Sequence, residues 1–380
     1  MSDIFTVCFP IGFYYPAEGG PNNSIYWIAK ALTRKGIPVR SISMDKDIPK
    51  SIARNIWHNT NYGTAMYVHS SNYILGIRYV LKTLHFKRKS NIILHLTSIF
   101  APTSILIALM YTTIYPNVKL IWSARGELDP AALIYRNKIK NLLISIHKFL
   151  FSQKVTYHAT CIEELNYIQQ AIKPHNNSIL IPNFIDLPTL ISTTKKDYIL
   201  YLGRIHPKKA IENLISAFAM MKYRNSGITL QIAGEYNNNY TKLLLELISK
   251  LNLNAKVEFV GHIEGLEKQR LIAGAKALIL PSHSENFGNV VVEALAQKTP
   301  VIASKGTPWE ILEQHNAGFW VENSPLGLAT AIDRLLDLDE TSYQNMCDNA
   351  LELVSAEFEV NRNIDKWINA YQKAINNEAN

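Results

Sequence analysis

The sequence predicts an α/β protein made of two doubly wound domains, each built on a parallel sheet. Apolar runs of strand length alternate with helix-like patterns in both halves of the chain, which is typical of parallel strands joined by crossover helices. The 380 residues suffice for two domains, because one domain usually holds about 100–200 residues. Hydrophobic residues make up 47% of the chain and charged residues 18%, so large cores are expected and disorder is excluded.

Strands in the first half are expected at apolar runs bounded by polar residues, namely Ile4–Phe9, Pro38–Met44, Ile92–Leu96, Leu120–Ser123, Lys154–Ala159 and Ser178–Ile181. Helices are expected between them, where apolar residues recur at three- and four-residue spacing, at Asn22–Lys35, Pro102–Tyr111, Ile134–Phe151 and Ile162–Ala171. The uncharged stretch from Ile92 to Tyr115 is long enough to span a bilayer. Polar residues near its middle favour a buried strand followed by a core helix that begins near Pro102.

The second half repeats this alternation. Its strands are expected at Tyr198–Leu202, Thr229–Ala233, Val257–Val260, Ala277–Leu280 and Pro300–Ala303. Its helices are expected at Ile211–Met221, Lys242–Leu251, Glu267–Ala273, Asn289–Gln297 and Trp309–Gln314, and a final helix near Arg362–Asn376 has no strand after it.

These elements predict a domain at 1–187, a second domain at 188–361, and a C-terminal helix at 362–380 that packs back on the first domain. The polar segment Leu187–Asp197 is the expected linker. Ligands of such sheets bind at the carboxyl ends of the strands. We therefore expect the site in a cleft between the two domains.

The charge of the chain is uneven. Its net charge is +8, but residues 1–190 hold 20 lysines and arginines against 9 acidic residues, whereas the remainder holds 19 against 22. This asymmetry favours an anionic partner for the first half, such as a nucleic acid, a lipid surface or a phosphorylated substrate; solubility together with chance is the alternative. Nucleic acid is the weakest of these, because the basic residues are not interleaved with aromatic ones and no recognition motif is present.

The stretch 134–154 is cationic and amphipathic (IYRNKIKNLLISIHKFLFSQK). Such a helix can lie on an anionic membrane face, although the pattern favours a core-facing helix with a solvated rim. The run Lys87-Arg88-Lys89 adds a second basic patch. The N-terminus carries Asp3 and no basic region, so no signal peptide is expected and we predict a cytoplasmic protein, with peripheral contact at the inner face of the membrane as an option.

The sharpest motif is Glu285-Asn-Phe-Gly-Asn-Val-Val-Val-Glu293, which follows a predicted strand and opens a helix. Gly288 allows a ligand to approach the backbone closely, and the free amides at a helix start attract phosphate or a polar sugar face. A carboxylate at Glu293 can accept hydrogen bonds from both hydroxyls of a ribose. A capping loop followed by an exposed helical Glu is the alternative.

A second motif, Gly203-Arg204-Ile-His-Pro-Lys208-Lys209, follows another predicted strand. Its cations lie before a helix N-terminus, an unfavourable place unless an anion is bound. A diphosphate would supply that anion, with Arg204 as a planar fork and Lys209 as a point charge. A solvated basic loop is the alternative.

The first domain offers weaker signals. Gly19-Gly20 follows the first strand and could place backbone amides against a phosphate, or it is a plain turn. Arg125 and Glu127 lie on a loop that closes a strand and suit a polar ligand, or they staple the loop. His95 near a strand end is a further ligand candidate or a core histidine. The three cysteines are far apart, and neither they nor the Asp-x-Asp triplets predict a metal site.

Taken in order, Gly19-Gly20, Gly203-Arg204…Lys209 and Glu285-x7-Glu293 resemble the motifs of family 4 glycosyltransferases of the GT-B fold. The most specific piece is Ser284–Glu310. Together with Ser123–Leu133 it is similar to the bacterial subgroup that builds lipopolysaccharide core, O-antigen or capsule. The chain departs from the family at Ala210, where glycine is usual, at Phe184 and at Asn286.

The resemblance implies a role for each matching residue. The first domain would bind the acceptor, through His95, Arg125 and Glu127, and the second would bind the donor. Donor-binding residues would be Gly20, Gly203, Arg204, Lys209, Glu285, Asn286, Phe287, Gly288, Asn289 and Glu293. Glu285, Arg204, Lys209 and Arg125 would be the catalytic residues, with neither metal nor other cofactor.

We therefore expect a retaining, metal-independent glycosyltransferase that moves a hexose or N-acetylhexosamine from a nucleotide-diphosphate sugar, with UDP as the expected carrier, to a lipid-linked glycan. A GDP-sugar-dependent transferase, a nucleotide-sugar epimerase and a non-catalytic glycan-binding subunit stay open as alternatives. A nicotinamide-dependent oxidoreductase would use Asp45 on a ribose hydroxyl, but the missing G-x-G-x-x-G argues against it.

Overall fold

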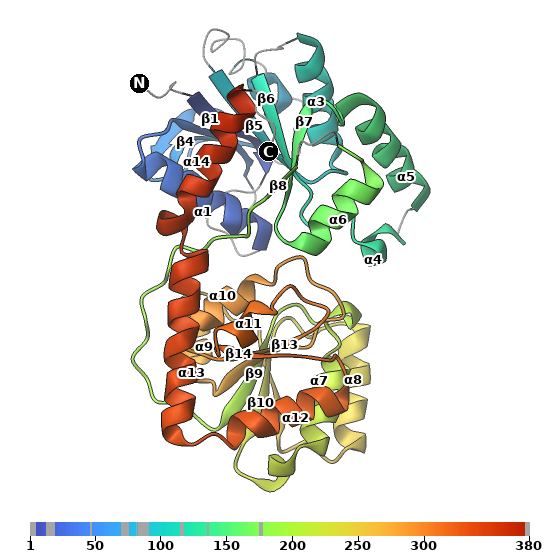
Figure 1. The fold of residues 1–380 in the computed structure, drawn as a ribbon, viewed down its shortest axis with the longest axis vertical. Coiled ribbons are helices and arrows are strands. Elements are labelled where there is room, and N and C mark those ends of the chain that lie inside the picture. Colours follow the sequence, from blue (N-terminus) through green and yellow to red (C-terminus); the bar gives the residue numbers. More distant parts are fainter. Residues whose placement is uncertain are drawn as a thin grey trace. The chain divides into compact units, whose positions relative to one another are not determined.

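The computed structural model describes residues 5–12, 20–45, 48–69, 76–80, 82, 91–114, 118–134, 137–174 and 178–376. The chain divides into two compact units. Unit 1 comprises Met1–Asp186 and Val360–Asn380, and unit 2 comprises Leu187–Glu359. The first unit is therefore discontinuous in sequence, and it is completed by the red C-terminal helix in Figure 1.

Unit 1 contains an eight-stranded sheet of order β3-β4-β2-β1-β5-β6-β7-β8. Its strands are β1 Phe5–Gly12, β2 Val39–Met44, β3 Trp57–Thr60, β4 Gly63–Val68, β5 Asn91–Thr97, β6 Val118–Ser123, β7 Val155–Ala159 and β8 Ser178–Leu180. All neighbouring pairs are parallel except β3 and β4. The central strands are buried along nearly their whole length, as expected for a parallel sheet with helices on both faces.

The helices of unit 1 are α1 Gly20–Arg34, α3 Pro102–Ile114, α4 Pro130–Leu133, α5 Asn137–Ile146, the π-helical turn η1 His147–Phe151, α6 Ile162–Ala171 and α14 Val360–Asn376. The C-terminal α14 packs beside α1 and against β5 and β6. It does so because Trp367 and Tyr371 are fully buried in the same core as Phe5 and Val7 of β1.

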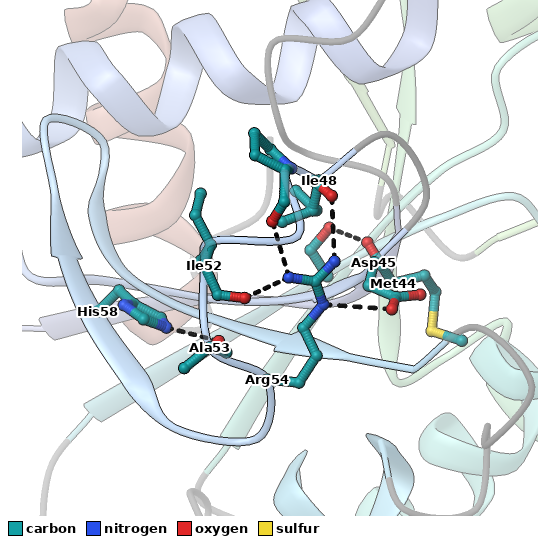
Figure 2. A network of polar contacts seen from close by, with 9 residues as sticks. Met44, Asp45, Ile48, Ile52, Ala53, Arg54 and His58 are labelled. Atoms are coloured by element: carbon teal, nitrogen blue, oxygen red, sulfur yellow. Dashed lines mark hydrogen bonds and ion pairs between the residues drawn. The ribbon is translucent and has the colours of Figure 1, made fainter.

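A polar network holds the loop that follows β2. Figure 2 shows Arg54 at its centre. The Arg54 Nε donates to Asp45 at 3.2 Å, and the terminal nitrogens donate to the carbonyls of Ile48 and Pro49, both at 3.0 Å. The same guanidinium donates to the carbonyl of Ile52. One arginine thus satisfies several loop carbonyls. Asp45, the residue that a nicotinamide enzyme would use, is an ion-pair partner of Arg54.

Unit 2 contains a six-stranded, fully parallel sheet of order β11-β10-β9-β12-β13-β14. Its strands are β9 Tyr198–Leu202, β10 Thr229–Ala233, β11 Val257–Gly261, β12 Ala277–Leu280, β13 Val301–Ser304 and β14 Gly318–Val321. The helical elements are η2 Pro207–Lys209, α7 Ile211–Met220, η3 Lys222–Asn225, α8 Asn239–Lys250, α9 Gly265–Gly274, α10 Asn289–Leu295, α11 Ile311–Gln314, α12 Pro325–Leu336, α13 Glu340–Leu353 and η4 Val354–Phe358.

The predicted fold class is confirmed, since each unit is built on a largely parallel sheet with crossover helices. Five elements were not predicted from the sequence, namely β3, β4, β14, α12 and α13. A single helix was predicted over Ile134–Phe151, whereas α5 begins at Asn137 and passes into the π-helical turn η1. In the part of the chain that the structure describes, no helix combines the length and the hydropathy needed to cross a membrane.

Candidate functional site

The strand ends of unit 2 bring backbone segments close together. Gly203 follows β9 and Gly234 follows β10, both with positive φ, of 153° and 157°. A Cβ atom at Gly234 would lie 2.1 Å from the carbonyl oxygen of Gly203, so only glycine fits there. The sequence analysis predicted Gly203 as a site residue and missed Gly234, whose requirement depends on the neighbouring strand.

The loop after β9 carries the predicted cations. The hydroxyl of Tyr201 donates to the carbonyl of Arg204 at 2.8 Å, and burial together with the Glu285 carboxylate raises the pKa of Tyr201. The side chain of Arg204 is exposed. Ala210, which ends η2, adopts a left-handed conformation with φ of 48°, where the family's usual glycine would be unstrained. This alanine therefore preserves the turn at a cost in strain.

The loops after β9 and β12 are joined by two contacts. The amide of His283 donates to the carbonyl of Lys208 at 2.9 Å, and the ammonium group of Lys209 forms an ion pair with Glu285. Both side chains of that pair are largely shielded, with 16% and 13% exposed. Ser282 also donates to Glu285, at 2.7 Å. Two residues that lie far apart in sequence thus form one charged pair at the carboxyl edge of the sheet.

Aromatic packing fixes the loop that carries the Glu285 motif. The ring centroids of Phe287 and Trp309 lie 5.0 Å apart, and Trp309 donates its indole N–H to the carbonyl of Phe287. Gly288 has a φ of 83° and forms the N-cap of α10, which begins at Asn289. The predicted donor residue Phe287 is therefore buried, and its packing against Trp309 supports the loop.

Glu293, predicted to bind a ribose, projects from α10 and is paired with Lys268 of α9 at 3.2 Å. Lys268 was not identified from the sequence, because the contact joins two helices. Such an ammonium group can hold a carboxylate in one orientation.

The first-unit candidates are held by internal contacts. Glu127 accepts from the hydroxyl of Ser98 at 2.6 Å and from the amides of Ile99 and Phe100 at 2.6 and 3.1 Å. It therefore anchors the segment before α3. Arg125 has a φ of 56° and donates to the side chain of Asn183.

The loop that carries Arg125 and Glu127 is also held from α6. Glu164, which the sequence analysis did not single out, accepts from the amides of Gly126 and Thr160. Gly20 is the first residue of α1, whereas Gly19 and the run at 87–89 lie outside the described residues.

His95 belongs to a buried chain of hydrogen bonds. The His158 Nε2–H donates to the carbonyl of Ile181 at 2.8 Å, so His158 Nδ1 accepts from Ser123 at 2.7 Å. His95 Nε2–H then donates to Ser123 at 2.8 Å, and Tyr371 donates to His95 Nδ1 at 2.9 Å. Burial lowers the pKa values of both histidines. Both ring nitrogens of His95 are engaged, so its predicted contact with an acceptor finds no support in this geometry.

No cluster of three or more His, Cys, Asp or Glu side chains suited to a metal occurs in the described segments. The positive groups at the strand ends of unit 2, Arg204 and Lys209, instead suit an anionic ligand. Rossmann-like units commonly bind their ligands at this edge of the sheet.

The comparisons with known proteins find sequence similarity in unit 2. Residues 188–352 match the family described as Glycosyl transferases group 1. Glycogen synthase of Mycobacterium tuberculosis is 30% identical over 163 residues, which cover 42% of this chain and 39% of that protein. The chain thus spans about two fifths of the length of this curated relative.

Solved structures with low identity share the fold over nearly the full length. Sucrose-phosphate synthase from Thermosynechococcus elongatus has a TM-score of 0.75 at 19% identity, covering 98% of this chain and 99% of that chain. HepE of Anabaena, in complex with UDP and glucose, has a TM-score of 0.72 at 16% identity, covering 96% and 99%. These structures show that the fold is GT-B, and the family match covers most of unit 2.

Proposed function

We propose that the protein is a retaining glycosyltransferase that transfers a hexose or N-acetylhexosamine from a UDP-sugar to a lipid-linked glycan, in the synthesis of a bacterial surface polysaccharide. The observation that carries the proposal is the presence of the Lys209–Glu285 pair and of the exposed Arg204 at the carboxyl edge of the unit 2 sheet. The glycosyltransferase match over this unit and the UDP complex of a structural neighbour support the choice of donor.

The charges of this edge fit the chemistry of the transfer. When the bond between the sugar and the nucleoside diphosphate breaks, negative charge develops on the departing phosphate. Arg204 and Lys209 would stabilise that charge where it forms, and one such interaction is often worth about 3–4 kcal/mol. Protein cations would thus take the part that a divalent ion plays elsewhere, and we propose a metal-independent reaction.

The carboxylates would orient the donor. Glu285, held by Lys209 and Ser282, would accept hydroxyls of the donor sugar. Glu293, steadied by Lys268, would accept the ribose hydroxyls. The acceptor hydroxyl would attack the face of the sugar that the diphosphate leaves, which retains the anomeric configuration. Arg125 and Glu127 are the proposed acceptor-side residues, with His95 in a positioning role.

The test is calorimetric titration of the full chain with UDP, GDP, ADP and their sugar conjugates, followed by turnover with a lipid-linked acceptor. Arg204→Ala and Lys209→Ala should each lower turnover about 100- to 1000-fold. Lys250→Ala, an exposed lysine at the end of α8, is the matched control and should behave as the wild type. Wild-type rates in both site variants would overturn the proposal. Nuclear magnetic resonance of the product reports the anomeric outcome, and turnover in a chelator tests metal independence.

A further inference from the structure

The outer surface of α5 and η1 is unusually apolar for an exposed helix. Leu142 and Ile139 of α5 are 62% and 59% exposed, and Phe149 of η1 is 88% exposed. Spacings of three and seven residues place these side chains along one helical face. Ile134, just before α5, is 74% exposed. Figure 1 shows α5 at the periphery of unit 1.

The same surface is positively charged. Residues 130–162 contain no aspartate or glutamate but several lysines. Lys138 and Lys148 are exposed on this helical segment. Lys148, Lys154 and Lys173 line a hollow of about 540 Å³ beside Phe149. Among the residues that the structure describes, none of these lysines forms an ion pair.

Apolar side chains next to lysines with no acidic residue between them match the interface of a bilayer with anionic headgroups. Phenylalanine and leucine enter the boundary between headgroups and acyl chains, while lysines meet the phosphates. A partner protein would have to combine acidic side chains with a matching apolar patch. A lipid bilayer offers anionic headgroups and apolar acyl chains together.

We propose that the surface formed by Ile139, Leu142, Phe149, Lys148 and Lys154, called here the α5 surface, docks the protein on anionic phospholipid membranes. This inference rests on the proposed function, because docking would bring the protein to a lipid-linked acceptor held at that membrane. The π-helical turn η1 contributes by presenting Lys148 and Phe149 to solvent while it buries His147 and Phe151.

The experiment is sedimentation of the full chain with vesicles of phosphatidylcholine alone, or with an equal part of phosphatidylglycerol. We expect binding to the anionic vesicles only, weakening as NaCl is raised because salt screens the attraction. The double variant Lys148→Gln/Lys154→Gln should bind less tightly by about fivefold per lysine. Leu142→Ser/Phe149→Ser should bind at least about tenfold less tightly.

The matched control lies on α8 of unit 2. Leu243 is 61% exposed, like Leu142, and Lys242 beside it is exposed as well. Lys242→Gln/Leu243→Ser should bind vesicles as the wild type does. If the wild type does not sediment with anionic vesicles, or if the α5 variants bind these vesicles as tightly as the control variant does, the inference is wrong.

Donor binding separates this inference from the proposed function. The α5 variants should bind UDP as the wild type does without vesicles, because the α5 surface contains none of the donor residues, all of which except Gly20 lie in unit 2. Vesicle binding without any nucleotide binding would contradict the proposed donor chemistry alone. Nucleotide binding without vesicle binding would contradict the α5 surface alone.

Discussion

At the strand ends of unit 2, individual site residues could be predicted from the sequence, but the contacts between them could not. Gly203, Lys209 and Glu285 were identified because each follows an apolar run that ends a strand. Their mutual contacts were not predictable, since Lys209 and Glu285 are 76 residues apart. The partners Gly234 and Lys268 were missed for the same reason: nothing local in the sequence marks them.

The close approach of Gly234 to Gly203 gives a residue-scale prediction. Gly234→Ala would place a methyl group 2.1 Å from the Gly203 carbonyl and would force a positive φ on alanine. We expect a loss of about 2 kcal/mol or more in the free energy of unfolding, together with weaker UDP binding because the loop that carries Arg204 must move. Chemical denaturation and calorimetry measure the two effects.

Gly227 is the control for this change, because a Cβ atom there meets nothing within 4 Å. Gly227→Ala should leave nucleotide affinity unchanged. If Gly234→Ala had the stability and the UDP affinity of the wild type, the loops after β9 and β10 could separate freely. That result would contradict the packing of Gly234 against Gly203.

At the scale of elements, the missed segments have identifiable causes. The strand β3 reads Trp-His-Asn-Thr and is half exposed at the sheet edge, so it lacks an apolar run. The strand β14 (Gly-Phe-Trp-Val) begins with a glycine and lies at the sheet edge, so its apolar run is only three residues long. Helix α12 could have been found, because Ser324 caps it and Pro325 occupies its first turn. The long alternation of the remaining elements was sufficient to predict both parallel sheets.

The C-terminal helix α14 yields a prediction at this scale. Trp367 is 1% exposed and packs against both His95 and His158, with ring centroids 4.9 and 4.6 Å away. Trp367→Ala should destabilise unit 1 by about 3–5 kcal/mol, through lost burial and the cavity left behind. The exposed Lys373 on the same helix provides the control, because Lys373→Ala should change stability by less than about 0.5 kcal/mol.

Thermal unfolding monitored by calorimetry distinguishes these variants. An unchanged transition in Trp367→Ala would mean that α14 does not belong to the cooperative core of unit 1. Trp367→Phe should cost less stability than the alanine variant, because it keeps most of the ring. It also removes an indole N–H that is buried and has no hydrogen-bond partner among the described residues.

At the scale of the whole molecule, the two units should respond differently to acid. Burial lowers the pKa of His147 to about 4 and that of His158 to about 3, and lowers that of His95 well below its usual value. All three residues lie in unit 1. In the unfolded chain each histidine takes up a proton near pH 6.5. The neutral histidines therefore contribute to the stability of unit 1 above pH 6.5. This contribution is lost as the pH falls from 6.5 toward the lowered pKa values of the folded state.

We expect the unfolding transition of unit 1 to shift to lower temperature between pH 7 and pH 4. Each histidine should remove about 1.4 kcal/mol per pH unit within its window. Calorimetry at a series of pH values measures this shift, and His147→Gln should make the dependence shallower. A unit 1 transition that stays constant over this range would contradict the neutral state of these rings.

The discontinuity of unit 1 has a consequence for how the protein is made. The ribosome releases residues 187–359 before Val360–Asn376, whose Trp367 and Tyr371 fill the core of the unit that emerged first. Nascent domains fold as they emerge, so the second unit can mature while the first still waits for its last helix. The part of the chain that is synthesised earliest is thus the part that is finished last.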